Sequence, residues 1–433
     1  EKSISFHFFR VAVRRPPLGL GSGRLVSDED FTPTWEQLPK HLISPLVERP
    51  SQKHRHRSTP RRRELLKAPA QCSECLELKA EVVSPLSDDM RLIDHEHPKF
   101  PSLGRLFESM GFTRVARHRS KDVSLYRQGD VNFIVNAEKE SFAQGFARVH
   151  GPSVCAIAFR VKNAAFAYKR ALSLGAWGVE GKVGPMELNI PAIKGIGDSL
   201  IYLVDRYGPR GSIYEVDFEY LPGVDPNPPG VGLTYIDHLT HNVHRGRMAE
   251  WADFYERLFN FREIRYFDIE GKLTGLKSKA MTSPCGKIRI PINESSDDKS
   301  QIQEYLSAYH GEGIQHIALG TSDIYRSVET LKAGGVPFQD VPDTYYQQVD
   351  ARLPGHGEDL KRMAADRILI DGAPTKGGGL LLQIFTQTVI GPIFFEIIQR
   401  RGNEGFGEGN FRALFESIEL DQIRRGVLQD KAS

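Results

Sequence analysis

The pattern of apolar and polar positions separates an irregular N-terminal stretch from a regularly patterned remainder. From about Leu106 onward, short apolar runs typical of strands alternate with segments in which apolar residues recur at helical spacing. Residues 1–89 show neither period, so this segment is predicted to be disordered or an extension without a role in the fold. Met90, the first methionine, is expected to lie close to the natural start of the protein.

An internal repeat organises the patterned region. Residues 151–176 read GPSVCAIAFRVKNAAFAYKRALSLGA, and residues 311–336, at an offset of 160, read GEGIQHIALGTSDIYRSVETLKAGGV. Each copy predicts an apolar strand followed by a helix that ends at a glycine, Gly175 or Gly335. The repeat therefore predicts two homologous halves, an N-terminal module over residues 90–222 and a C-terminal module over residues 232–428.

The junction and the C-terminus add detail to these modules. A linker is marked by Pro222, Pro226, Pro228 and Pro229. Near the C-terminus, apolar residues at steps of three to five predict a closing helix over Asn410–Leu428. Each module mixes several strands with helices, which predicts an α+β fold whose curved sheet encloses a pocket.

Three polar residues stand inside strongly apolar strands of the C-terminal module. His238 lies in LTYIDHL (233–239), His316 in GIQHIAL (313–319) and Glu396 in PIFFEII (392–398). An ionised carboxylate in such a strand is costly to bury unless it is paired or binds a metal. Two histidines and one carboxylate form the facial triad of non-haem Fe(II) oxygenases, which leaves positions open for substrate and dioxygen. These three residues are the predicted metal ligands.

A single histidine in an apolar strand is more often a hydrogen-bonded core residue than a ligand, so the prediction depends on all three together. The N-terminal module gives an internal comparison, because Ala156 stands at the position that matches His316. His241 follows His238 by three residues, and strand alternation turns it to the opposite face. The metal site is therefore expected in the C-terminal module alone.

Composition limits the classes of partner. The formal net charge is +2, so no overall field favours nucleic acid or an anionic membrane. No apolar run is long enough to span a bilayer. Four cysteines in 433 residues are too few for a disulfide framework, which favours a reducing cytoplasm.

Three N-terminal motifs allow alternative interpretations. Residues 19–23 resemble a nucleotide-binding loop, but Arg24 replaces the third glycine and no strand precedes it, so a linker is expected. Cys72 and Cys75 would be half of a zinc site that lacks its second pair. The basic tract 53–63 would bind nucleic acid or direct targeting, while a solvated tail is the simpler interpretation.

Several motifs together resemble one family. They are IDHLTHNV (236–243), GLKSKAM (275–281), IRIPINE (288–294), SQIQEYL (300–306), GIQHIAL (313–319), LLLQIFTQ (380–387), FFEIIQRRG (394–402) and GFGEGNFRALFESIE (405–419). Over residues 90–428 the chain resembles the bacterial 4-hydroxyphenylpyruvate dioxygenases of the vicinal-oxygen-chelate superfamily. The resemblance implies glyoxalase-like βαβββ modules that form open barrels.

The resemblance also implies roles for particular residues. The iron ligands would be His238, His316 and Glu396. The polar wall of the pocket would comprise Ser278, Asn293, Gln301, Gln315 and Gln383; the substrate ring would lie between Phe385 and Phe411, with Phe406 and Asn410 on the closing C-terminal element. Gln315 precedes a ligand and points off the metal's face, so its role would be indirect. Phe411 has a second interpretation, in which it only packs its helix.

The implied reaction converts 4-hydroxyphenylpyruvate and O2 to homogentisate and CO2 in tyrosine catabolism, with Fe(II) as the cofactor. The 2-oxo acid would take two open positions on the metal and dioxygen the third, and decarboxylation of the substrate would supply the electrons. The resemblance further implies a homo-oligomer, a tetramer or a dimer. No nucleic acid or membrane partner is expected.

Three groups of functions remain as alternatives. 4-Hydroxymandelate synthase shares ligands and substrate but hydroxylates the benzylic carbon, and Asn293 favours the dioxygenase by resemblance. An extradiol catechol dioxygenase or a glyoxalase-type isomerase would use similar modules. The pocket motifs argue against both of these functions. A non-catalytic binding module, or a nucleic-acid binder with a basic tail, is disfavoured by the intact triad and by the near-zero charge.

Overall fold

The structure is a computed structural model that describes residues 81–85, 102–181, 183–184, 186–270, 275–297, 300–410 and 413, with backbone alone for residues 81–85, 269, 270 and 275. The following predictions lie outside these ranges: the motifs at residues 19–23, 53–63 and 72–75, the start at Met90, and Phe411. Of the closing helix predicted over Asn410–Leu428, only residues 410 and 413 are described; both are helical, and the helix begins at Glu408.

The N-terminal half contains strands and helices in mixed order. They are β1 (Glu81–Pro85), α1 (Leu103–Ser109), β2 (Thr113–His118), β3 (Val123–Gln128), β4 (Val131–Asn136), α2 (Phe142–His150), β5 (Ala156–Arg160), α3 (Ala164–Ser173), β6 (Gly178–Val179), β7 (Ala192–Lys194), β8 (Leu200–Val204), α4 (Ile213–Asp217) and β9 (Phe218–Tyr220), with 3-10 turns η2 (Ile196–Asp198) and η3 (Gly208–Arg210). β1 lies before residue 90, where this module was expected to begin, and within the segment predicted to be disordered or without a role in the fold. That prediction is wrong for residues 81–85, because their backbone pairs with β4 and β5.

The C-terminal half follows with longer strands. They are β10 (Leu233–Val243), α5 (Met248–Phe259), β11 (Arg262–Glu270), β12 (Gly275–Thr282), β13 (Arg289–Ser295), α6 (Gln301–Tyr309), β14 (Gly313–Thr321), α7 (Ile324–Ala333), α8 (Asp343–Gln347), α9 (Val349–Arg352), α10 (Leu360–Asp366), β15 (Leu369–Gly372), η4 (Pro374–Lys376), β16 (Leu380–Phe385) and β17 (Phe394–Arg401). Among the helices in the described ranges, none is long and apolar enough to cross a membrane.

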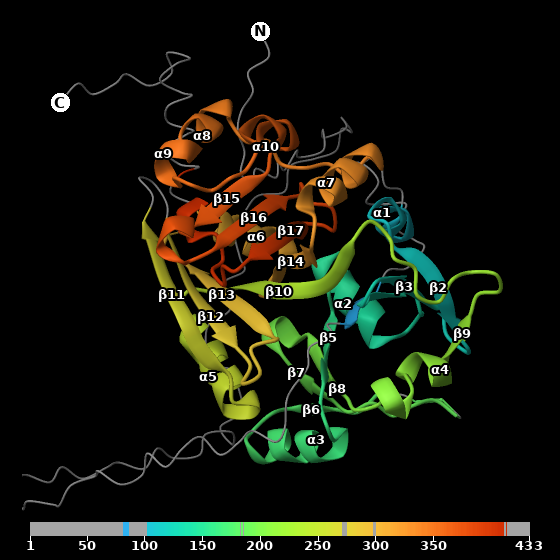
Figure 1. The fold of residues 1–433 in the computed structure, drawn as a ribbon. Coiled ribbons are helices and arrows are strands. Elements are labelled where there is room, and N and C mark those ends of the chain that lie inside the picture. The colour runs from blue at the N-terminus through green and yellow to red at the C-terminus, as the bar shows by residue number, and fades with distance from the viewer. Residues whose placement is uncertain are drawn as a thin grey trace, which may run out of the picture. The chain divides into compact units, whose positions relative to one another are not determined.

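The two sheets repeat one strand order (Figure 1). The first runs β6-β7-β8-β5-β1-β4-β3-β2-β9, and the second runs β15-β16-β17-β14-β10-β13-β12-β11. In both sheets an antiparallel central pair, β1 with β5 or β10 with β14, is flanked by parallel pairs. Each half therefore contains two βαβββ units, and the α+β fold predicted from the repeat is confirmed.

The repeated helices match at the predicted offset. α3 and α7 begin 160 residues apart, and the side chains of their N-cap residues, Asn163 and Asp323, accept hydrogen bonds from the first turn. Both helices end just before a glycine in the left-handed region, Gly175 with φ +90° and Gly335 with φ +87°. Glycine adopts this conformation without steric cost, so these residues end the helices as predicted.

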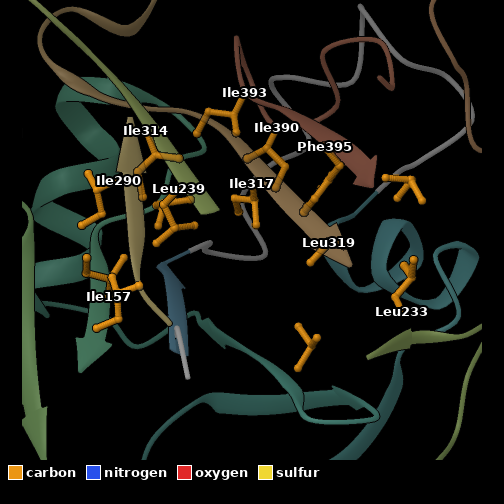
Figure 2. Packing of buried hydrophobic residues seen from close by; sticks show 14 of the residues in the cluster. Ile157, Leu233, Leu239, Ile290, Ile314, Ile317, Leu319, Ile390, Ile393 and Phe395 are labelled. Atoms are coloured by element: carbon orange, nitrogen blue, oxygen red, sulfur yellow. The ribbon is translucent and has the colours of Figure 1, made fainter. Parts of the chain in front are cut away.

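Alternation along the strands of the second sheet places one face in the main core. Leu239, Ile317 and Phe395 are fully buried in the apolar cluster shown in Figure 2. Each is next in sequence to a predicted ligand, and successive strand residues point to opposite faces. Burial of such side chains stabilises the fold by about 1.5–3 kcal/mol each. That burial therefore fixes the direction in which the ligands point.

The repeat also shapes a contact between the two halves. His150, at the end of α2, donates from Nδ1 to the carbonyl of Tyr309 at 2.8 Å, and His310 donates to the carbonyl of Val149 at 3.1 Å. Both bonds join the same two sequence positions of the repeat, taken from opposite halves. The His150 ring also stacks on Tyr309 with ring centroids 4.6 Å apart.

His150 is expected to make stability depend on pH. Burial lowers the pKa of His150 below its usual 6.5, although the Tyr309 carbonyl opposes this. The unfolded chain therefore binds more protons, so stability is full above about pH 6.5 and is lost as the pH falls. Urea unfolding between about pH 7.5 and 5.5 should show this decline, and His150→Gln should flatten it. If the free energy of unfolding depended on pH equally in both proteins, His150 would not be the group responsible.

Candidate active site

The three predicted ligands lie on neighbouring strands. β14, which carries His316, lies between β10 with His238 and β17 with Glu396. In the register, Ala318 pairs with both His238 and Glu396, and it lies on the same face as His316. Because Ala318 carries only a methyl group, the larger side chains around it can converge above the sheet.

The distances between the ligand atoms fit a metal ion. His238 Nε2 lies 3.2 Å from His316 Nε2 and 3.2 Å from a Glu396 carboxylate oxygen, and the His316–Glu396 distance is 3.4 Å. In an octahedral shell with ligands about 2.1 Å from the ion, adjacent ligand atoms lie roughly 3.0 Å apart. Among the described residues, His238, His316 and Glu396 form a group of side chains that could hold a metal ion, which confirms the predicted triad.

The hydrogen bonds of the two rings leave both Nε2 atoms available to a cation. His238 Nδ1 lies 2.8 Å from an Asp237 carboxylate oxygen, and His316 Nδ1 lies 3.1 Å from Gln315 Oε1. Both partners accept hydrogen bonds, so each Nδ1 carries the proton and each neutral ring presents a lone pair on Nε2. Two lone pairs and a carboxylate oxygen then face one another, which an ion stabilises.

Electrostatics keep Glu396 ionised. Burial alone would raise the pKa of its carboxyl, but His238 and His316 lower it to about 2. Burial lowers the pKa of His316, whereas for His238 the neighbouring Glu396 and Asp237 outweigh burial and raise it. The carboxylate therefore carries its charge at neutral pH and is available as an anionic ligand.

Asp237 accepts a hydrogen bond from Nδ1 of His238, the ring nitrogen that does not face the other two ligands. It was not among the predicted site residues. Its carboxylate accepts two hydrogen bonds from Arg400, both at 2.7 Å, and a longer one from Arg289 at 3.4 Å. Burial would raise the pKa of Asp237, but Arg400 and His238 hold it well below its usual range. Such a carboxylate fixes the ring orientation of a metal-ligating histidine. The available signal was its place beside the first ligand in IDHLTHNV.

Comparison with known proteins identifies the family. Residues 85–219 match the model "Hydroxyphenylpyruvate dioxygenase, HPPD, N-terminal", and residues 235–349 match "Glyoxalase/Bleomycin resistance protein/Dioxygenase superfamily". 4-Hydroxyphenylpyruvate dioxygenase of Pseudomonas aeruginosa is 64% identical over 326 residues, which are 75% of this chain and 91% of that protein. The chain belongs to the 4-hydroxyphenylpyruvate dioxygenase family.

Relatives with other names share the same sequence region. The Vibrio vulnificus protein named hemolysin VllY is 62% identical over 356 residues, 81% of this chain and 99% of that protein. A solved structure of a mutant 4-hydroxymandelate synthase from Streptomyces coelicolor has a TM-score of 0.62 and 26% identity, covering 74% of this chain and 94% of that one. The family and the two-module fold expected from the motifs are thereby confirmed.

In this member of the 4-hydroxyphenylpyruvate dioxygenase family, aromatic rings surround the triad. Phe406 lies edge-on to His238 with centroids 5.3 Å apart, and Phe385 lies edge-on to His316 at 6.3 Å. Phe394 stacks on His316 at 4.9 Å and contacts Phe385 at 5.9 Å. Sequence reasoning predicted Phe385 and Phe406 but missed Phe394. Its place two residues before Glu396, on the same face of the strand, was the signal.

The predicted polar residues lie on several elements of the C-terminal half. Ser278 on β12 lies opposite Asn293 on β13, and the Asn293 amide contacts Asn242 Oδ1 at 3.4 Å. Gln383 on β16 is buried, and its Oε1 has no hydrogen-bond partner among the described residues. Gln301 is the first residue of α6 and is partly buried. The roles of these residues remain predictions.

Asn410 lies in the first turn of the closing element. Its Oδ1 accepts a hydrogen bond from Tyr345 on α8 at 2.6 Å, and Arg352 on α9 approaches the same atom. The Gly409 amide donates to the Asp371 carboxylate at 2.8 Å. The contacts of Asn410 therefore fasten the closing element to α8 and α9, two helices without a counterpart in the described part of the N-terminal half.

The N-terminal module replaces two ligand positions by other residues. Ala156 matches His316, and Tyr202, paired with Ala158, matches the position of Glu396. Tyr202 packs against an apolar cluster of this module that includes Val115 and Leu125. Burial raises the pKa of Tyr202 to about 12. Neither position supplies an anionic or imidazole ligand, which agrees with a metal site in the C-terminal module alone.

Gly407→Ala is expected to impair turnover by displacing either the Gln383 amide or the closing element. Gly407 has φ +78°, and a Cβ there would lie 2.3 Å from Gln383 Oε1. Displacement by about 1 Å near a reacting centre costs up to roughly 100-fold in rate. Gly402→Ala is the matched control, because it has φ +81° but meets nothing closer than 3.8 Å. Equal kcat/KM in the two variants would contradict the steric argument.

Proposed function

We propose that the chain converts 4-hydroxyphenylpyruvate and O2 to homogentisate and CO2 in tyrosine catabolism, with Fe(II) held by His238, His316 and Glu396. The observation that carries the proposal is the buried convergence of two imidazole lone pairs and one carboxylate. The chain that presents it is 64% identical to a 4-hydroxyphenylpyruvate dioxygenase. A 2-His-1-carboxylate set with open positions is typical of non-haem iron oxygenases.

The residues of the chain would prepare the site for this chemistry. A bound Fe(II) ion would supply a Lewis acid to which a 2-oxo acid could bind as a chelating ligand and at which dioxygen could be activated. Asp237 and Gln315 fix the tautomer of the two histidines, so that both Nε2 atoms point to one place. Glu396 reduces the positive charge of the centre and stays ionised at neutral pH.

The aromatic and polar neighbours would orient the substrate. Phe385 and Phe394 lie beside His316 and offer apolar faces to a phenol ring. Gln383, whose Oε1 lacks a partner among the described side chains, and the facing pair Ser278 and Asn293 offer polar contacts. A buried amide oxygen without a partner is costly, so a ligand hydroxyl that donates to Gln383 would be favoured.

The nearest alternative is 4-hydroxymandelate synthase activity. It is supported by the likeness to the Streptomyces coelicolor structure, but at 26% identity, against 64% for the Pseudomonas aeruginosa dioxygenase. Both reactions would use the same triad and the same substrate. Only the carbon that is oxidised would differ.

The test is anaerobic reconstitution with Fe(II), followed by 4-hydroxyphenylpyruvate and air, with products identified by chromatography and mass spectrometry. Homogentisate supports the proposal. 4-Hydroxymandelate would retain the metal centre and assign the alternative activity. Bound iron without oxygen consumption would overturn the substrate assignment, and failure to bind iron would overturn the centre itself.

Two further expectations accompany this function. A homo-oligomer, either a tetramer or a dimer, is proposed from the family resemblance, and light scattering of the purified chain tests it, since a monomer would contradict it. A cytoplasmic location also stays a prediction.

A further inference from the structure

Arg400 contacts the support of a metal ligand. It lies on β17 four residues after Glu396, and its side chain is only 7% exposed. Its Nε and Nη2 atoms donate to the two oxygens of Asp237, each at 2.7 Å. Such two-point pairing fixes the plane of a carboxylate as well as its position. Because Asp237 accepts from His238 Nδ1, Arg400 indirectly sets the orientation of that ring.

The same guanidinium holds the segment that leads to the closing element. Its Nη1 atom donates to the carbonyl oxygens of Asn403 at 3.0 Å and Gly405 at 2.6 Å. Its centre lies 5.7 Å from the ring of Phe406, which in turn packs edge-on against His238. The contacts therefore form a closed loop from His238 through Asp237, Arg400 and Phe406 back to His238.

We propose that Arg400 is a positioning residue that couples the orientation of His238 to the docking of residues 403–407 on the catalytic sheet. The inference rests on the metal centre of the proposed function, because it concerns one ligand of that centre. When residues 403–407 are docked, Arg400 contacts their carbonyl oxygens as well as Asp237. Asp237 then keeps the His238 ring pointed toward the ion. By linkage, metal binding favours docking by the same factor by which docking favours metal binding.

A simpler role for Arg400 would be to neutralise Asp237. Arg289 makes a related bridge, contacting Asp237 at 3.4 Å and pairing with Glu404. If only charge mattered, lysine at position 400 would serve as well as arginine. Lysine carries a single ammonium and cannot pair with both carboxylate oxygens while also donating to two carbonyls of the segment. Arg400→Lys therefore separates coupling from neutralisation.

The experiment uses full-length, metal-free protein and Co(II) alone as the probe. Visible absorption gives the Co(II) dissociation constant, and mass spectrometry follows chymotrypsin cleavage after Phe406 in the same samples. In the unchanged protein, Co(II) should slow this cleavage as the site fills. In Arg400→Lys, Co(II) should bind roughly tenfold more weakly, and cleavage after Phe406 should no longer respond to Co(II).

Controls keep the proposal open to contradiction. Arg401→Lys alters the next residue, which pairs with Glu358 instead, and should leave both readouts unchanged. If circular dichroism shows that Arg400→Lys does not fold, Arg289→Lys replaces it, with smaller changes expected in the same direction. An unaltered dissociation constant, or weaker binding with Co(II)-dependent protection intact, would overturn the coupling. Failure of the unchanged protein to bind Co(II) would instead overturn the metal centre.

Discussion

Glu396→Gln is expected to lower kcat/KM for 4-hydroxyphenylpyruvate by about 1000-fold or more. The amide has nearly the shape of the carboxylate, but it removes the only anionic group of the triad. A catalytic metal stabilises the transition state by several kcal/mol, and each 1.4 kcal/mol corresponds to a factor of about ten in rate. Homogentisate formation and the iron content of the purified variant are the measurements, and both should fall.

Glu329→Gln is the matched control for that substitution. Glu329 lies on α7, is exposed, and pairs with Arg362 at 2.9 Å. Surface pairs of this kind contribute little, so activity and iron content should stay unchanged. If Glu396→Gln kept both its iron and its activity, the triad would not be the metal site.

Asp237→Asn is expected to weaken both the metal centre and the fold. Asp237 is fully enclosed and accepts hydrogen bonds from His238, Arg400 and Arg289. Asparagine lacks the charge, so the Arg400 guanidinium would be left as a poorly compensated buried cation. Removing one partner of a buried ion pair lowers the free energy of unfolding by about 3–5 kcal/mol. Loss of the support for His238 should weaken metal binding roughly 10-fold to 100-fold.

Urea unfolding of the metal-free protein and a Co(II) titration measure the two effects separately. Asp340→Asn serves as the control, because Asp340 pairs with Arg367 at the surface and is 57% exposed. It should change neither quantity by a measurable amount. Wild-type stability in Asp237→Asn would mean that Arg289 and Arg400 do not depend on this carboxylate.

Local patterns in the sequence were sufficient to predict the repeat and the triad. The offset of 160 predicted α3 and α7 together with the glycines that end them, because capping and helix termination are local properties. The triad was predictable because each ligand is a polar residue in an apolar strand, and the burial of Leu239, Ile317 and Phe395 turns the ligands to one face.

The support around the triad could not be predicted in the same way. Regular alternation would turn Asp237 to the face opposite His238, but a register shift between Ile236 and His238 breaks the alternation there. The Asp237 carboxylate consequently reaches the neighbouring ring. Its partner Arg400 lies 163 residues further along the chain, and no local pattern links the two.

The sequence by itself determined the two-module α+β architecture, the strands that carry His238, His316 and Glu396, and the family, because periodicity and motif order are properties of short segments. The tertiary structure alone decided how those strands lie side by side, so that Ala318 leaves room between the ligands and Arg400 contacts both Asp237 and residues 403–407. These contacts join residues far apart in sequence, and strand register and packing, which depend on the whole sheet, determine them.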